Sequence, residues 1–220
     1  AKLAAALELE LALPGIGVGQ EAENQAVLAA LAARVNAAAG TNYVATSFET
    51  SDRRGIEVGF LHDADRVRAL EVARFGDDAP GVAEAFGVRS PSRGREPLQG
   101  VFQVGGRTLT VIGNHFKSKG GDDPPYGVAA LEDKPFLRPS ELQRKAQARV
   151  VRQAVNALLA ADPEALVMVA GDLNDFPFGE PGEGDDHPLA ILEGGPGEVP
   201  LTNLVNHVEP GERYTFVFGG

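Results

Sequence analysis

The chain has 220 residues, a formal net charge of −11 at pH 7, no cysteine and 43% hydrophobic residues. This length suits one large domain with a sizeable core, and the absence of cysteine excludes disulfides and thiolate chemistry. Without a run of about 20 apolar residues, no membrane span is predicted. Because proteins that hold nucleic acid over their whole surface are usually basic, a phosphate substrate would need a local basic patch or a cation.

The apolar patterns predict helices and strands along the chain. Helices are predicted over residues 2–13, 26–39 and 140–160. Strands are predicted over residues 16–19, 43–48, 56–61, 67–73, 101–104, 108–112, 165–170 and 214–218. Gly105-Gly106 has the spacing of a two-residue hairpin turn. The first predicted helix carries Glu8 and Glu10 and lacks a cleavage pattern, so we do not interpret it as a signal peptide.

Strands joined by hairpins, with helices that cover packed sheets, indicate an α+β fold in a single domain over residues 1–220. The helix over residues 140–160 is predicted to begin with a capping box, Ser140-Glu141-Leu142-Gln143. Its expected apolar face consists of Leu142, Ala146, Val150, Ala154 and Leu158. The basic residues of this helix are interpreted as a solvated face, and they are Arg144, Lys145, Arg149 and Arg152.

Two polar motifs lie at the ends of apolar, strand-like runs. Asn114-His115-Phe116-Lys117-Ser118-Lys119 supplies a histidine beside two lysines, which suits a phosphate pocket. Gly171-Asp172-Leu173-Asn174-Asp175 places a carboxylate and an amide two residues apart after a buried strand, where α/β sheets often bind ligands. Each motif alone fits a structural histidine, surface lysines or a polar turn. Together they supply the acid/base, the water-positioning group and the neutral donor of a metal-assisted phosphodiesterase.

Carboxylates elsewhere offer sites for a cation. Glu21 follows a short apolar run, and it is a lone carboxylate of the kind that a hard divalent cation prefers. The same position also allows Glu21 to belong to the acidic first turn of a helix. An acidic, turn-rich loop over residues 179–187 contains Asp185-Asp186 and offers a site for Ca²⁺, although it lacks the spacing of an EF-hand.

In this order the motifs resemble those of the endonuclease/exonuclease/phosphatase (DNase I-like) superfamily. The Phe-Lys-Ser-Lys run after His115 is most similar to bacterial secreted nucleases of that superfamily. The similarity covers residues 15–220. The matching motifs are Gln20-Glu21, Asp52-Arg53-Arg54-Gly55-Ile56, the motif at 114–119, the motif at 171–175 and Arg213-Tyr214-Thr215-Phe216.

The resemblance implies a four-layer α/β/β/α sandwich with its site where the two sheets open. It implies that Glu21 binds a catalytic Mg²⁺ or Mn²⁺ and that His115 contacts the scissile phosphate and protonates the leaving oxygen. By the same resemblance, Asp172 orients water and Asn174 binds a phosphate oxygen. The expected substrate-binding residues are Arg54, Asn114 and Lys117.

The chain departs from the superfamily pattern at its ends. Members begin with a strand that carries an active-site asparagine, and they end with an Asp-His motif that follows the Tyr-Thr-Phe strand. This sequence starts after the first feature and stops before the second. The resemblance therefore implies a domain truncated at both ends, without its first and last strands. Residues 1–220 alone are expected to bind metal weakly and to cleave poorly, because residues that act as a unit fail together.

These observations predict a metal-dependent phosphodiester hydrolase, namely a nuclease that cleaves DNA or RNA and is secreted or periplasmic. One alternative is a phosphatase or phosphodiesterase acting on an inositol or lipid headgroup. A second alternative is a catalytically incomplete binding domain. The sequence indicates no protein partner.

Overall fold

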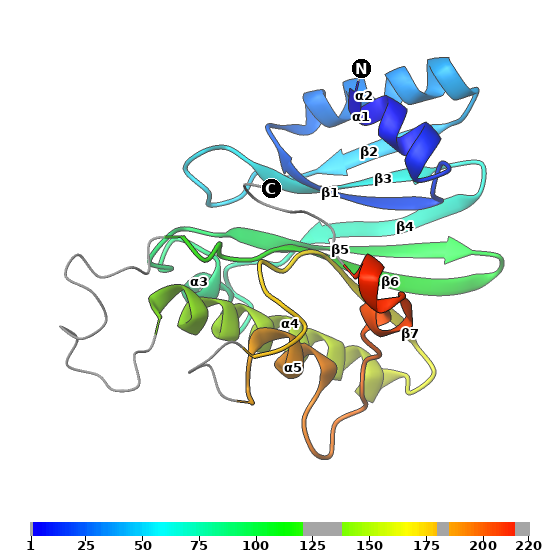
Figure 1. Ribbon diagram of the computed structural model, residues 1–220. Coiled ribbons are helices and arrows are strands. Elements are labelled where there is room, and N and C mark those ends of the chain that lie inside the picture. Colours follow the sequence, from blue (N-terminus) through cyan, green and yellow to red (C-terminus); the bar gives the residue numbers. More distant parts are fainter. Residues whose placement is uncertain (1, 121–137, 180–184, 214–220) are drawn as a thin grey trace.

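The fold consists of two packed β-sheets with helices on the outer face of each, as the computed structural model in Figure 1 shows. The structure describes residues 2–120, 138–179 and 185–213. The layers follow one another as helix, sheet, sheet and helix, which confirms the predicted α+β sandwich. The predicted strand over residues 214–218 lies outside the described residues.

The first sheet has three antiparallel strands in the order β1-β3-β2. Its strands are β1 (Ile16–Ala22), β2 (Tyr43–Ser47) and β3 (Glu57–Asp63). Helix α2 (Gln25–Ala39) covers its outer face, starting after an Asn24 cap that accepts from the Val27 N–H and ending at left-handed Gly40. Helix α1 (Lys2–Ala5) continues as a π-helical segment (Ala6–Glu10) and ends earlier than predicted, because Ala12 and Leu13 take positive φ angles.

The second sheet has four strands in the order β4-β5-β6-β7, with β6 and β7 parallel and the other pairs antiparallel. Its strands are β4 (Val67–Arg74), β5 (Arg95–Val104), β6 (Arg107–His115) and β7 (Leu166–Asp172). The predicted hairpin between β5 and β6 is confirmed, and both of its glycines have positive φ. Strand β5 starts six residues before its predicted start. Its first half is a polar segment that contains a proline, so no apolar pattern marked it as a strand.

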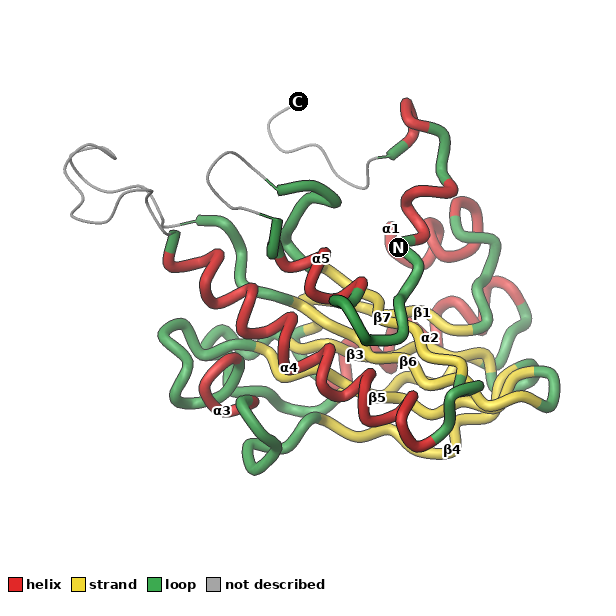
Figure 2. Tube along the Cα trace, turned by 90° about the horizontal axis from the view of Figure 1, so that it is seen from below, coloured by secondary structure: helices red, strands yellow, loops and turns green. Residues whose placement is uncertain are grey.

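Three helices cover the second sheet, and Figure 2 shows α4 lying across the strands. The helices are α3 (Val82–Ala85), α4 (Pro139–Ala161) and α5 (Pro188–Glu193), and two 3₁₀ turns follow at Leu204–His207 and Pro210–Glu212. Among the described helices, none is both long and apolar enough to cross a membrane. The predicted capping box is wrong, because the N-cap of α4 is Arg138 and the Ser140 hydroxyl instead accepts from Arg144 Nη1.

The assignment of the α4 faces is also corrected by the structure. Leu142 is 48% exposed, whereas Arg144, Lys145 and Arg152 are buried. An α-helix has 3.6 residues per turn, so residues at steps of four rotate by about 40° each time and cannot all face one core. Val151 and Val155 fill the interface with the sheet instead.

A continuous apolar layer holds the two sheets together. Phe60 of β3 and Phe102 of β5 are fully buried and meet edge to face, with ring centroids 5.3 Å apart. Val58, Leu98 and Val111 pack around them. Burial of each such side chain contributes roughly 1.5–3 kcal/mol. This layer fixes the two sheets relative to each other, and with them the strand ends that carry the candidate site.

We predict that Gly171→Ala destabilises the protein by about 2–4 kcal/mol, because its backbone combines strain with close approach. Gly171 has a φ of 123°, and a Cβ there would overlap the Asn114 carbonyl oxygen. Gly106→Ala is the control, since Gly106 also has positive φ but no heavy atom within 4 Å of its Cβ position. Chemical denaturation would measure both, and equal losses would contradict the proposed steric cause.

Candidate active site

Three charged or polar residues form a row across the second sheet. The strand register pairs Arg95 of β5 with His115 of β6, and His115 in turn with Asp172 of β7. His115 therefore lies between a cation and a carboxylate. Its Nε2 atom is 3.8 Å from Asp172 Oδ2, which is close but beyond a direct hydrogen bond.

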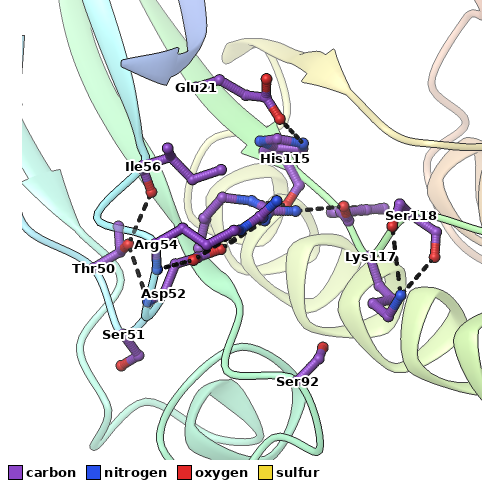
Figure 3. A network of polar contacts seen from close by, with 12 residues as sticks. Glu21, Thr50, Ser51, Asp52, Arg54, Ile56, Ser92, His115, Lys117 and Ser118 are labelled. Carbon is purple, nitrogen blue, oxygen red and sulfur yellow. Dashed lines mark hydrogen bonds and ion pairs between the residues drawn. The ribbon is translucent and has the colours of Figure 1, made fainter. Parts of the chain in front are cut away.

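Glu21 reaches this row from the first sheet. The register between β1 and β3 shifts after Gly19, and Glu21 has a φ of 58°. This irregularity at the end of β1 changes the direction in which the Glu21 side chain points. Its Oε1 atom is 4.0 Å from His115 Nε2, and Figure 3 shows the carboxylate directed at the ring. The alternative reading of Glu21 as the first turn of a helix is wrong, because Glu21 lies in β1 and α2 begins at Gln25.

The loop after β7 holds Asp172 and Asn174 together. The backbone N–H of Asn174 donates to Asp172 Oδ1 at 2.9 Å, and Asn174 Nδ2 donates to the Phe116 carbonyl at 3.0 Å. Asn174 has a φ of 50°, a left-handed conformation that asparagine tolerates better than most residues. Glu21, with a φ of 58°, is the more strained of the two, and such strain persists only where the surrounding structure enforces it.

Asn114 lies beneath this surface. Its side chain is fully buried, and Nδ2 donates to the carbonyls of Ile112 at 2.8 Å and Ala170 at 3.3 Å. The structure thus brings Glu21, His115 and the loop at 172–174 together but does not bring Asn114 to their surface. Its role in substrate binding stays a prediction.

A buried ion pair supports the row from one side. Arg95 donates to Asp52 Oδ2 at 2.8 Å, and also to the backbone carbonyls of His115 at 3.3 Å and Phe116 at 2.9 Å. Arg54, which is mostly exposed, makes a two-pronged contact with Asp52 through Nε and Nη2. Burial by itself would raise the pKa of Asp52, but the hydrogen bonds from Arg54 and Arg95 outweigh it and lower the pKa to about 2.

The same surroundings keep His115 neutral at pH 7. Burial and the neighbouring Arg95 cation lower the pKa of His115 to about 4, against the opposing pull of the Asp172 carboxylate. Nδ1 is buried and has no hydrogen-bond partner among the described residues. We therefore assign the ring proton to Nε2, the nitrogen that faces the two carboxylates.

A basic pocket opens beside this row, with a volume of about 300 Å³. Lys117 contributes an ammonium group, which donates to the carbonyls of Ser118 at 2.9 Å and Gly120 at 3.1 Å. The other lining residues are Asp52, Arg53, Arg54, Ser92, Arg93, Gly94, Arg95, Ser118 and Gln147. Five cationic side chains and one carboxylate line the pocket, so an otherwise acidic chain has the local basic patch that a phosphate requires.

The donor set near His115 fits a weakly held hard cation. Glu21 and Asp172 present exposed carboxylates within 4.0 Å of His115 Nε2. Because that nitrogen carries the ring proton, the two carboxylates are the candidate ligands. Within residues 2–120, 138–179 and 185–213, no group of three or more His, Asp or Glu side chains is arranged to hold a metal ion. Mg²⁺ commonly binds one or two carboxylates and completes its shell with water and substrate phosphate, so two carboxylates suffice for such a site.

Two other features do not form comparable sites. An apolar pocket of about 380 Å³ lies between β7, α5 and the segment that follows α5, and Glu193 is its one titratable residue. In the acidic loop, Asp186 pairs with Lys145 at 2.8 Å and Arg149 at 3.4 Å. Residues 180–184 of that loop lie outside the described residues, so Ca²⁺ binding there stays a prediction.

Sequence reasoning missed Arg95, Arg93 and the buried role of Asp52. Alternation of Glu96, Leu98, Gly100 and Phe102 is the signal that could have extended β5 back to Arg95, but Pro97 obscures it. No local pattern marks a buried arginine, because its partner Asp52 is 43 residues away.

Comparisons with known proteins agree with this fold. Residues 5–183 match the model of the Endonuclease/Exonuclease/phosphatase family. Among curated proteins, no significant match is found. Several solved structures share the fold, and the chain spans less than two thirds of the length of each one described below.

The first is humanized D. rerio TDP2 with 14 mutations, 20% identical over 89% of this chain and 59% of that one, with a TM-score of 0.53. The second is D. rerio TDP2 complexed with single strand DNA product, 20% identical over 89% and 58%, with a TM-score of 0.51. The third is the human Nocturnin catalytic domain with bound sulfate anion, 16% identical over 80% and 58%, with a TM-score of 0.51.

We predict that His115 makes the stability of the metal-free protein depend on pH. Between its usual pKa of 6.5 and its folded pKa of about 4, the unfolded chain binds a proton that the folded chain does not. The free energy of unfolding should therefore fall as pH falls through this window, by up to about 3 kcal/mol. Denaturation of wild type and His115→Gln at several pH values, in a chelator, would isolate the contribution of His115. Identical slopes of the free energy of unfolding against pH for both proteins would contradict the prediction.

Proposed function

The chain belongs to the endonuclease/exonuclease/phosphatase family, and we propose that it hydrolyses phosphodiester bonds in a nucleic acid strand. One observation carries this proposal: the His115 imidazole lies beside the carboxylates of Glu21 and Asp172, next to a basic pocket. Hydrolysis of a phosphodiester needs cationic groups for its charge, a donor to a phosphoryl oxygen and a group that orients water. The bound DNA product of D. rerio TDP2 supports a nucleic acid as the substrate class.

The proposed cofactor is Mg²⁺ or Mn²⁺, held by Glu21 with Asp172 as a second carboxylate. When bound, such a cation polarises the phosphoryl group and stabilises the negative charge that develops on it. The two protein carboxylates leave most of the shell to water and substrate. We therefore expect cation and substrate to bind more tightly together than either binds alone.

The residues of the chain then divide the remaining tasks. His115 donates a hydrogen bond from Nε2 to a phosphoryl oxygen, and the negative charge of the bound phosphate raises the pKa of the ring. A ring that has taken a proton from solvent on Nδ1 can then release its Nε2 proton to the leaving oxygen and stay neutral. Asp172 accepts a hydrogen bond from the attacking water through Oδ2. Asn174 uses one amide N–H on Phe116, so its second N–H is available to a phosphate oxygen.

The basic pocket would receive the flanking phosphates of the strand. Arg54 lines it with a mostly exposed side chain, and Lys117 lines it just after the end of β6. Arg93 has a φ of 41°, a strained conformation that turns the chain at the pocket wall. Clustered arginines suit phosphates because the guanidinium group can donate two parallel hydrogen bonds to one phosphate.

We predict that His115→Ala in the full-length protein lowers kcat for oligonucleotide cleavage by about 10²–10⁴-fold, the usual cost of losing a positioned acid/base. The measurement is cleavage of an end-labelled oligonucleotide in Mn²⁺, with His207→Ala as the control because His207 lies exposed in a 3₁₀ turn. Full cleavage in excess EDTA by metal-free protein would contradict the metal dependence. Hydrolysis of inositol or lipid phosphates in place of oligonucleotides would favour the headgroup alternative.

We predict that Arg93→Gln weakens oligonucleotide binding for all sequences and lowers the slope of log affinity against log salt by about one. The physical reason is that a phosphate bound by Arg93 releases condensed counterions. Arg107→Gln is the matched control, because Arg107 is exposed at the opposite end of β6 from His115. Equal salt slopes for Arg93→Gln and wild type would show that the oligonucleotide does not bind in the basic pocket.

A further inference from the structure

Two phenylalanines lie exposed on the loop that follows Asp172 and carries Asn174. Phe176 is 46% exposed and Phe178 is 59% exposed. Their rings stack with centroids 5.2 Å apart and planes at 2° to each other. Phenylalanine is usually buried, so a parallel pair left open to water beside polar residues is an informative exception.

The loop holds these rings in place before any ligand arrives. Asp175 lies between Asn174 and Phe176 with a fully buried side chain, and it pairs with Arg144 at 3.0 Å and Lys119 at 2.7 Å. Pro177 fixes the backbone φ between the two rings. A rigid surface loses less conformational entropy on binding, so a ligand that stacks on these rings would bind at a lower entropic cost.

One ring keeps more open surface than the other. Lys119 Nζ lies 4.2 Å from the centroid of the Phe176 ring, a cation–π contact, and Phe178 stacks against the same ring. Phe178 is therefore the ring that offers more of its surface to a flat partner. The nearby Lys119 cation favours a partner that also carries negative charge.

The pair lies close to the proposed chemistry. Phe176 follows Asp172 by four residues, so their Cα atoms are at most about 14 Å apart. A nucleic acid strand with one phosphate bound at His115 and Asp172 can place a neighbouring base over this loop. Lys117 and Lys119 leave β6 in the same region, which supplies positive charge along the path.

We propose that Phe176 and Phe178 form a stacking platform for an unpaired base, and that the preferred substrate is therefore single-stranded nucleic acid. The inference rests on the proposed function and adds the form of the strand. Every base has a π face, so such a platform binds without sequence specificity. In a duplex those faces are already stacked on neighbouring bases, and they become available only when the strand is open.

The test compares three ligands in EDTA, where cleavage does not complicate binding. They are a fluorescent ten-nucleotide dA strand, an abasic phosphodiester of the same length and a blunt duplex of the same sequence, measured by anisotropy. We expect Phe178→Ala to weaken binding of the dA strand by about 5- to 150-fold, the range for one stacked base. Binding of the abasic strand and of the duplex should change by less than about twofold.

Three control variants sharpen the result. Phe178→Tyr should bind the dA strand like wild type, because its ring still stacks, and Phe178→Leu should bind it like Phe178→Ala. Leu70→Ala removes an exposed apolar side chain from β4, at the opposite edge of the second sheet from β7, and should change nothing. Equal loss for dA and abasic strands, or full binding by Phe178→Leu, would overturn the platform.

A wild-type protein that binds the abasic strand as tightly as the dA strand would also overturn it. Failure of the proposed function has a different signature, because it is the absence of oligonucleotide cleavage in Mn²⁺ by the wild type. Equal cleavage of the dA strand and the abasic strand, with Phe178→Ala indistinguishable from wild type, would support the proposed function and contradict the stacking platform.

Discussion

The buried ion pair between Asp52 and Arg95 is the contact on which the candidate site depends. The two side chains are 5% and 7% exposed and meet at 2.8 Å. Asp52 lies in the loop between β2 and β3 of the first sheet, whereas Arg95 starts β5 of the second and also holds the carbonyls of His115 and Phe116. Loss of Asp52 would leave Arg95 as an uncompensated buried charge, which typically costs about 3–5 kcal/mol. The pair therefore fixes the position of His115 relative to both sheets.

This arrangement separates positive and negative charge around a neutral ring. The basic pocket lies on the Arg95 side of His115, and the carboxylates of Asp172 and Glu21 lie within 4.0 Å of Nε2. In the proposed function, the basic side attracts a phosphate, while the acidic side holds a cation and water. Such a division would let an acidic chain of net charge −11 bind the proposed polyanionic substrate.

The sequence predicted features that depend on local patterns, and it missed those that depend on distant partners. The Gly105-Gly106 hairpin and the strand before Asp172 follow from turn chemistry and apolar runs. The expected burial of that strand is wrong, because β7 lies at the edge of its sheet and its residues are partly buried or exposed. The meeting of Glu21 with His115 follows from their places at the ends of separate strands, whereas the metal role of Glu21 rested on the resemblance, since its position alone also fitted a helical turn. Arg144 was assigned to solvent, yet it is buried against Asp175, because a charge is buried only where the tertiary fold supplies its counterpart.

The protonation state of His115 tests this account most directly. NMR of the ring nitrogens in metal-free protein should show a neutral imidazole at pH 7, with the proton on Nε2 and a pKa of about 4. Addition of inorganic phosphate should shift the Nε2 resonance and raise the pKa, because the anion would lie against that nitrogen. An imidazolium at pH 7, or a ring that does not respond to phosphate, would contradict a phosphate site built around His115.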